Sequence, residues 1–180
     1  MTAMPELAPN SMKERLSAGD RTFGVWLDSM RTPTIVRIAA IAGADFVFID
    51  IEHSSLSMET VADMCEMARA CGISPIVRPH SRDAGGIGRI LDVGAMGIML
   101  PDVTRPDEAV ALREAALYPP RGQRGSTAQS AAQDYRIGAG DVMTAAINEH
   151  MLLAVQVESR AGVDGLEAVL ATGSVDFIEV

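Results

Sequence analysis

Short apolar runs alternate with longer amphipathic stretches along this chain. Runs of this length, bounded by turn residues, are typical of buried parallel strands. We expect strands at 22–27, 46–50, 75–78, 97–100, 152–157 and 175–180. The amphipathic stretches between them predict helices, so the pattern indicates an α/β fold with a parallel sheet built from βα units.

Two of the predicted helices have clear start signals. Ser57 can cap a helix that carries apolar side chains at offsets of three and four residues. Thr104 is the predicted N-cap of another helix, which has Pro106 and two acids in its first turn and runs to about Ala116. A turn-rich segment at 118–125 follows, and we expect a long loop from there to about residue 137.

The number of predicted strands leaves the architecture open at this stage. An open doubly wound sheet can hold six strands, whereas a (β/α)8 barrel needs eight and typically about 250 residues. The last run, 175–180, ends with the chain, although a natural terminus usually follows a helix or a polar tail. We therefore expect that the sequence is cut short.

Composition and charge narrow the class of protein. An apolar content of 48% in 180 residues fits one packed domain. The net charge of −9 and the absence of clustered Lys and Arg argue against nucleic acid binding. The apolar stretches are shorter than the ~20 residues of a membrane-spanning helix, and the first fifteen residues hold no signal-peptide core. A soluble cytoplasmic protein without membrane partners is the simplest interpretation.

Most of the candidate chemistry lies where the predicted strands end. In α/β folds the carboxyl ends of parallel strands form the ligand-binding edge. The side chains found there are Asp50, Glu52, His53, Arg78, Gln156 and Glu158. They combine a candidate base, an anion-binding guanidinium and an oxygen ligand for a hard cation. Each one alone is more often a helix cap or an ion-pair partner, but together they favour an active site.

The position of the single lysine restricts the chemistry further. Lys13 precedes the first predicted strand, so no strand offers an amine for a Schiff base. An enolate formed in this pocket would therefore depend on a metal ion and fixed hydrogen-bond donors. The sequence also lacks a full nucleotide-binding fingerprint, so we expect no nucleotide cofactor.

Six motifs in a fixed order point to a known family. They are GVW at 24–26, IDIEH at 49–53, VRP at 77–79, LDVGA at 91–95, YPP with RG at 118–125, and VQVE at 155–158. With these motifs the chain resembles the HpcH/HpaI aldolases over roughly residues 12–180. These are metal-dependent (class II) pyruvate aldolases, which include 4-hydroxy-2-oxoheptanedioate aldolase and 2-dehydro-3-deoxyglucarate aldolase.

The resemblance implies a fold and an activity. The fold is a (β/α)8 TIM barrel of the phosphoenolpyruvate/pyruvate type, with about six of its eight strands present in this chain. Residues 1–180 would form one incomplete domain, with an N-terminal segment and helix at 1–20 and six βα units at 21–180. The implied reaction is the reversible cleavage of a 4-hydroxy-2-oxo acid to pyruvate and an aldehyde, in aromatic or sugar acid catabolism, by a homohexamer.

The resemblance also implies roles for individual side chains. Glu158 would ligate Mg²⁺, Mn²⁺ or Co²⁺, and Arg78 would bind the oxygen region of pyruvate. His53, oriented by Asp50, would take the proton from the substrate hydroxyl.

Four further residues would support this chemistry. Glu52 and Gln156 would position water and ligand. Trp26 would line the substrate pocket, and Arg124 would lie near that pocket or near a subunit contact.

Two features depart from the family pattern. The second metal-ligating acid of the family lies in a Gly-Pro-x-Asp-Leu turn just after the strand that here ends at Val180. We therefore expect an incomplete metal site, which puts the activity of the 180-residue chain alone in doubt. Ser126 and Thr127 also replace an apolar residue and a glycine, which affects recognition of the far end of the substrate.

Two other hypotheses stay open. A relative of the citrate lyase β or malyl-CoA lyase branch would cleave CoA thioesters rather than free oxo acids. A fragment without catalytic activity would act in assembly. The sequence identifies neither the aldehyde partner nor the metal.

Overall fold

The computed structural model describes residues 7–136, 138 and 140–180. Its sheet has six parallel strands in the order β1-β2-β3-β4-β5-β6, so each strand pairs with its neighbour in sequence. The strands are β1 (Gly24–Leu27), β2 (Phe46–Asp50), β3 (Ser74–Arg78), β4 (Gly97–Leu100), β5 (Leu152–Gln156) and β6 (Phe177–Glu179). A doubly wound sheet reverses its strand order, and this sheet does not. The fold is therefore a partial (β/α)8 barrel, as the family resemblance implied.

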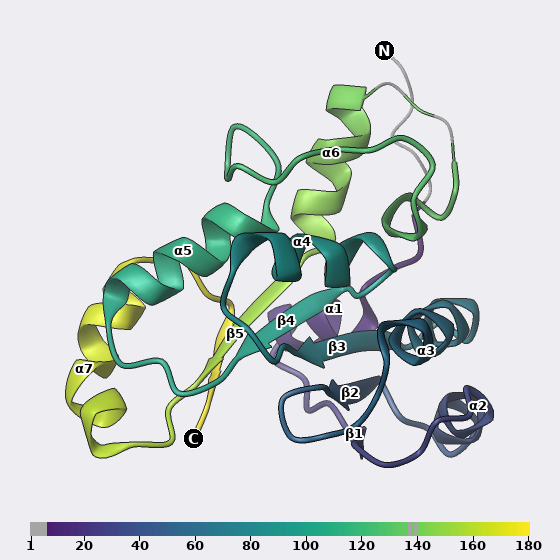
Figure 1. Cartoon of the computed structure of the whole chain (residues 1–180), viewed down its shortest axis with the longest axis horizontal. Helices are drawn as coiled ribbons and strands as arrows, with labels where there is room; N and C mark the ends of the chain where they lie inside the picture. Colours follow the sequence, from purple (N-terminus) through teal and green to yellow (C-terminus); the bar gives the residue numbers. More distant parts are fainter. Residues whose placement is uncertain (1–6, 137, 139) are drawn as a thin grey trace.

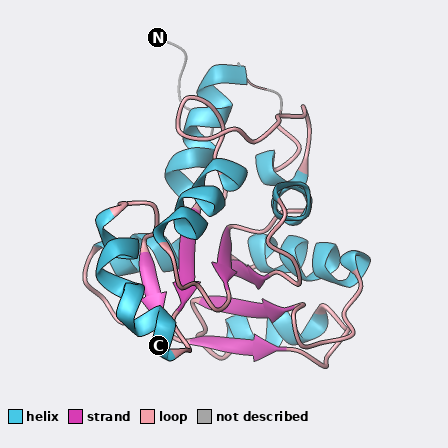
Figure 2. Cartoon of the chain, turned by 60° about the vertical axis from the view of Figure 1, so that its left-hand side comes forward, coloured by secondary structure: helices cyan, strands magenta, loops and turns pink. Residues whose placement is uncertain are grey.

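The helices that connect successive strands lie on the outer side of the curved sheet, whereas the first helix lies at the amino-terminal ends of the strands (Figures 1 and 2). The α-helices are α1 (Ser11–Ser17), α2 (Thr34–Ile41), α3 (Met58–Ala70), α4 (Ala84–Asp92), α5 (Pro106–Ala116), α6 (Gly140–His150) and α7 (Arg160–Ala171). The predicted loop before α6 also contains a short 3-10 helix, η1 (Ala131–Gln133). Residues 1–6 of the predicted N-terminal segment and residue 137 at the end of the predicted loop lie outside the described residues. None of the described helices is long and apolar enough to cross a bilayer.

One of the two predicted helix starts is confirmed and the other is displaced by one residue. Ser57 accepts a hydrogen bond from the Thr60 amide at 3.3 Å, as an N-cap does. The N-cap of α5 is Arg105 rather than Thr104. The reason is Glu108, because its carboxylate accepts hydrogen bonds from the amides of both Thr104 and Arg105. Glu108 is the third residue of the helix, and its side chain thus provides hydrogen-bond acceptors for amides that precede the first helical turn.

Two apolar cores lie on opposite faces of the sheet. The larger core fills the space between the strands and the outer helices, around residues such as Val47, Val77 and Leu153. The smaller core lies on the inner face and contains Phe48 and Ile76. Because side chains alternate between the two faces of a strand, both faces of each central strand are buried. This explains why the strands appear in the sequence as continuous apolar runs.

Asn10 fastens α1 across the amino-terminal ends of the strands. Its side-chain amide donates to the carbonyls of Met96 and His150, and its oxygen accepts from Ser74 Oγ at 2.7 Å and from the Lys13 amide. Asn10 is 1% exposed, so these bonds replace water almost completely.

We therefore expect Asn10→Ala to lower the free energy of unfolding by about 1–3 kcal/mol, because the substitution leaves buried carbonyl and hydroxyl groups without partners. Urea denaturation of both proteins measures the change. Asn10 lies at the opposite end of the sheet from the polar strand ends, so metal affinity should stay unchanged. A stability equal to that of the wild type would contradict this role.

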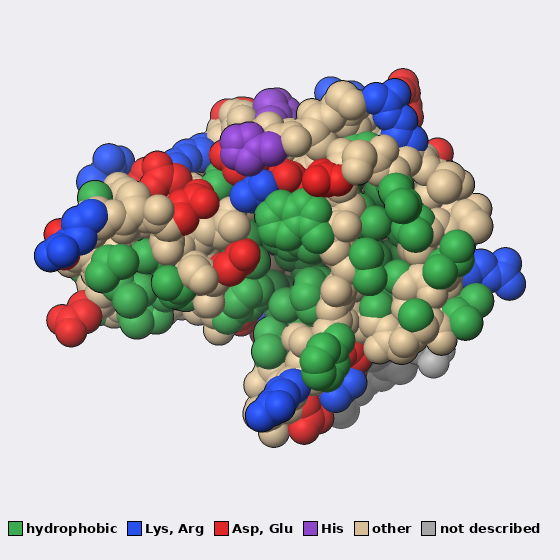
Figure 3. Space-filling model, turned by 90° about the horizontal axis from the view of Figure 1, so that it is seen from below, with side chains coloured by type: hydrophobic (Ala, Val, Ile, Leu, Met, Phe, Trp, Pro, Cys, Tyr) green, Lys and Arg blue, Asp and Glu red, His purple; other side chains and the backbone are tan. Residues whose placement is uncertain are grey.

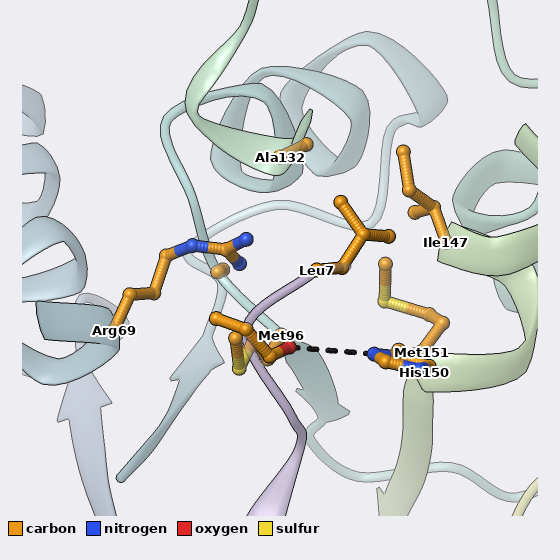
Figure 4. Close-up of a pocket in the computed structure, with 9 residues that line it drawn as sticks. Leu7, Arg69, Met96, Ala132, Ile147, His150 and Met151 are labelled. Atoms are coloured by element: carbon orange, nitrogen blue, oxygen red, sulfur yellow. Dashed lines mark hydrogen bonds between the residues drawn. The ribbon is translucent and has the colours of Figure 1, made fainter. Parts of the chain in front are cut away.

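A small cavity lies at the same amino-terminal end, where Arg69, Met96, Ala132, Ile147 and His150 surround Leu7 (Figure 4). Its volume is about 20 Å³, which suits about one water molecule and is too small for an organic substrate.

Candidate active site

A layer of polar side chains crosses the inner face of the sheet at the carboxyl ends of its strands. Its members are Asp50, Arg78, Gln156 and Glu179. Each lies two residues after an apolar residue of the same inner face, and the register pairs Asp50 with Arg78 and Gln156 with Glu179. The inner face therefore changes from apolar to charged at one level, and the strand-end prediction for Asp50, Arg78 and Gln156 agrees with this arrangement.

Hydrogen bonds join the whole layer. Arg78 donates from Nε to Asp50 Oδ1 at 2.9 Å and from Nη2 to Asp50 Oδ2 at 2.6 Å. Its Nη1 donates to Gln156 Oε1 at 3.3 Å. Gln156 Nε2 in turn donates to Glu179 Oε2 at 3.1 Å. Since Arg78 and Asp50 are 6% and 1% exposed, the guanidinium is held rigidly in a site with little access to water.

The ionisation of this pair follows from its contacts. Burial favours the neutral form of Asp50, but the hydrogen bonds from Arg78 and from the amides of Glu52 and His53 outweigh it, so the pKa of Asp50 lies below its ordinary 3.8. The same hydrogen bond with Asp50 raises the pKa of Arg78. Both groups are therefore charged at neutral pH.

Aromatic rings form the floor beneath the guanidinium. The Cζ atom of Arg78 lies 4.7 Å from the centre of the Trp26 ring and 5.9 Å from that of Phe48. The two rings are 4.5 Å apart. Such contacts restrict Arg78 and favour its positive charge. Trp26 is still 46% exposed, so part of its ring is available to line a pocket.

His53 differs from the expected arrangement, in which Asp50 orients its ring. Asp50 contacts only the main-chain amide of His53, at 3.3 Å, because both carboxylate oxygens already bind Arg78. The His53 side chain is 72% exposed, and its Nε2 lies 3.7 Å from Glu52 Oε2. The same Glu52 oxygen is 3.3 Å from Arg78 Nε. Glu52 therefore stands between the imidazole and the guanidinium.

Glu158 lies at the same edge, just beyond β5. Its Oε1 accepts a hydrogen bond from the Asp102 amide at 3.0 Å, and its charge contributes to the raised pKa of Arg78. The carboxylate is exposed and is a hard oxygen donor of the kind that Mg²⁺ and Mn²⁺ prefer. Among the described residues, no group of three or more His, Cys, Asp or Glu side chains could hold a metal ion. The residues thus fit one ligand of an oxygen-donor site.

Arg124 does not contact the polar layer at the carboxyl ends of the strands. Its Nη2 donates to Asp92 Oδ1 at 2.6 Å, and its Cζ lies 4.6 Å from the Tyr118 ring centre. Asp92 ends α4 on the amino-terminal side of the sheet, so Arg124 lies away from the polar layer.

An apolar hollow adjoins the polar layer on the inner face. Its volume is about 320 Å³, and its lining includes Trp26, Phe48, Ile76, Met99 and Glu179. Figure 3 shows this side of the molecule, with hydrophobic side chains around a hollow and charged and histidine side chains along its rim. A small organic acid could therefore place its charged end at the rim and its apolar part on the rings.

Sequence reasoning missed two members of the site. Phe48 was hidden within an apolar run, although its spacing of two residues from Asp50 places both on the same face. Glu179 has the same spacing from Phe177, and that alternation was a usable signal.

In a partial (β/α)8 barrel, charged groups gathered at the carboxyl ends of the strands occupy the position where TIM-barrel enzymes carry their active sites. Residues 22–180 match the family model described as HpcH/HpaI aldolase/citrate lyase. The chain belongs to this family, whose members are lyases and related enzymes.

Individual relatives agree with the family. The 2-keto-3-deoxy-L-rhamnonate aldolase of Salmonella paratyphi B is 35% identical over 97% of this chain and 65% of its own length. The crystal structure of an HpcH/HpaI aldolase from Desulfitobacterium hafniense is 30% identical, with a TM-score of 0.90 over 95% of this chain and 65% of that one. The citrate synthase SbnG is 29% identical, with a TM-score of 0.81 over 93% and 64%. The chain thus spans 65% of the length of the curated relatives that it matches.

Proposed function

We propose that this protein is a class II aldolase that cleaves a 4-hydroxy-2-oxo acid reversibly to pyruvate and an aldehyde. The observation that carries the proposal is the buried Arg78, fixed by Asp50 and Gln156 at the carboxyl ends of the strands. Lys13, the only lysine of this sequence, pairs with Asp176 near the amino-terminal ends, so none of the six strand ends described here carries an amine.

Arg78 is suited to bind the 2-oxo acid. Its Nη1 and Nη2 each carry a second N–H that can donate to the oxo oxygen and the carboxylate of the substrate. The positive charge then stabilises the enolate that develops at that oxygen, and the guanidinium needs no reorganisation because Asp50 already holds it.

His53 would act as the base in cleavage. It takes the proton from the 4-hydroxyl, the carbon–oxygen double bond of the aldehyde forms, and the bond between C3 and C4 breaks. The electron pair of that bond moves into the 2-oxo group and gives the enolate of pyruvate, which then takes a proton at C3. An exposed imidazole can exchange its proton with solvent between turnovers.

Glu158 would hold a divalent cation, together with oxygen atoms of the substrate and solvent, and that cation would supply Lewis-acid stabilisation of the enolate oxygen. Its hydrogen bond from Asp102 fixes one carboxylate oxygen and leaves the other side of the group exposed. Gln156 and Glu52, which both contact Arg78, would position water and the ligand.

Metal removal tests the proposal. We expect EDTA to abolish pyruvate release from a panel of 4-hydroxy-2-oxo acids that includes 2-keto-3-deoxy-L-rhamnonate, and Mn²⁺, Mg²⁺ or Co²⁺ to restore it. Glu158→Gln should weaken Mn²⁺ binding at least about 10-fold, because an amide is a poorer ligand for a hard cation. The matched control is Glu167→Gln on the exposed face of α7. Pyruvate release that persists in EDTA would overturn the metal role.

A second activity has a specific observation in its favour. The family description includes citrate lyase, and the similar citrate synthase SbnG shares the fold. Cleavage of CoA thioesters is therefore the alternative, and a direct comparison of acyl-CoA esters with free oxo acids separates the two.

The family also supports a cytoplasmic location and a homo-oligomer, for which we propose a hexamer. Light scattering measures the mass of the assembly.

A further inference from the structure

The peptide between Pro101 and Asp102 is bound on both of its sides. Arg82 Nη2 donates to the Pro101 carbonyl at 2.8 Å and to the Asp102 carbonyl at 2.8 Å. The N–H of the same Pro101–Asp102 peptide donates to Glu158 Oε1 at 3.0 Å. In a trans peptide the carbonyl and the N–H point in opposite directions, so this peptide lies between the Arg82 guanidinium and the Glu158 carboxylate.

The backbone at this point has an uncommon conformation. Asp102 has a φ of 44°, in the left-handed region that non-glycine residues seldom occupy. Such conformations persist where surrounding contacts hold them, and they cluster at functional sites. Here the holding contacts are the two hydrogen bonds from Arg82, the bond from the Asp102 amide to Glu158, and the bond from the Val103 amide to the Gln156 carbonyl.

Other contacts fix the rest of the loop at 101–105. Arg82 Nη1 also pairs with Glu108, whose other carboxylate oxygen binds the amides of Thr104 and Arg105. On the opposite side the loop packs closely on α7, where a Cβ added to Gly165 would lie 2.2 Å from the Thr104 carbonyl oxygen. The loop is therefore fixed at several points, and Arg82 fixes it at the Pro101–Asp102 peptide.

We propose that Arg82 is a positioning residue that orients Glu158 through the Pro101–Asp102 peptide. A cation on the carbonyl polarises the peptide and strengthens the hydrogen bond that its N–H donates to a carboxylate. The inference rests on the proposed function of Glu158 as the cation ligand. Arg82 does not touch the substrate, and its side chain is 41% exposed.

The Asp102 amide reports on this coupling without any metal. In the metal-free protein, we expect its NMR proton resonance to move upfield in both Arg82→Met and Glu158→Gln, since each variant weakens the same hydrogen bond. The effects in the double variant should be less than additive. The control is Arg105→Met in the same loop, because Arg105 pairs with Asp107 and not with the Pro101–Asp102 peptide. An Asp102 resonance that is unchanged in Arg82→Met would overturn the proposal.

Metal affinity gives the second readout. We expect Arg82→Met to weaken Mn²⁺ binding by about 10- to 100-fold in a calorimetric titration, as loss of a group that orients a metal ligand usually does. Arg82→Lys keeps the charge but loses the fork geometry, so it should fall between Arg82→Met and the wild type. A wild-type protein that binds no Mn²⁺ while its Asp102 amide still responds to both variants would contradict the proposed function but leave the coupling standing. Unchanged Mn²⁺ affinity in Arg82→Met would contradict the positioning role.

Discussion

Arg78→Leu is expected to lower the free energy of unfolding by about 3–5 kcal/mol and to reduce pyruvate release by about 100- to 1,000-fold. The stability loss follows because Asp50, 1% exposed, keeps a buried charge without its cation. The activity loss follows because Arg78 is the fixed positive group at the strand ends. Urea denaturation and a coupled lactate dehydrogenase assay for pyruvate measure the two effects.

The double variant Asp50→Leu with Arg78→Leu separates stability from activity. Replacement of a buried ion pair by apolar residues is often neutral for stability. We therefore expect the double variant to regain most of the lost stability and none of the activity. Recovery of pyruvate release in this variant would show that Arg78 acts only through folding.

The pH dependence of the Arg78→Leu effect has a definite sign. In the wild type, Arg78 lowers the pKa of Asp50, so this contribution to stability is present at neutral pH and is lost as pH falls below the ordinary 3.8. In the variant, burial without a cation should raise the pKa of Asp50, and protonation then relieves the cost. The stability difference between the two proteins should therefore shrink between about pH 7 and pH 4.5. A difference that grows over this range would contradict the buried pair.

His53→Ala is expected to lower kcat for cleavage by about 100- to 10,000-fold, the usual cost of losing a general base. The free energy of unfolding should change by no more than about 0.5 kcal/mol, because the His53 side chain is 72% exposed. Steady-state kinetics at saturating Mn²⁺ measures the first effect and urea denaturation the second.

His80→Ala is the matched control for this variant. His80 is an exposed histidine that follows the next strand, β3, and it belongs to none of the contacts of the site. Its loss should leave kcat unchanged. Full activity in His53→Ala would remove His53 from the mechanism.

The sequence predicted the positions of the six strands well, because the central strands are buried on both faces and so form continuous apolar runs. Phe46–Asp50 and Gly97–Leu100 match the predicted bounds. The edge strands are shorter than predicted, since the sequence pattern contains no information about how many residues find a pairing partner.

The sequence predicted which candidate residues lie at strand ends. It did not predict which of these side chains contact one another, because the contacts join residues that are distant in the sequence. Asp50, Arg78 and Gln156 were found because strand ends converge. The partner of Asp50 was assigned to His53, three residues away, whereas both carboxylate oxygens bind Arg78, which is 28 residues away. The contacts of Arg82 with the peptide at Asp102 likewise depend on packing that no local pattern contains.

Enolisation of pyruvate alone tests the central claim most directly, because it needs no knowledge of the aldehyde partner. In D₂O with Mg²⁺, proton NMR of pyruvate should show loss of the methyl signal at a rate that depends on wild-type protein and on the metal, and that falls to background in Arg78→Leu with Asp50→Leu. A methyl signal that decays no faster with protein than with Mg²⁺ alone would contradict a pyruvate aldolase.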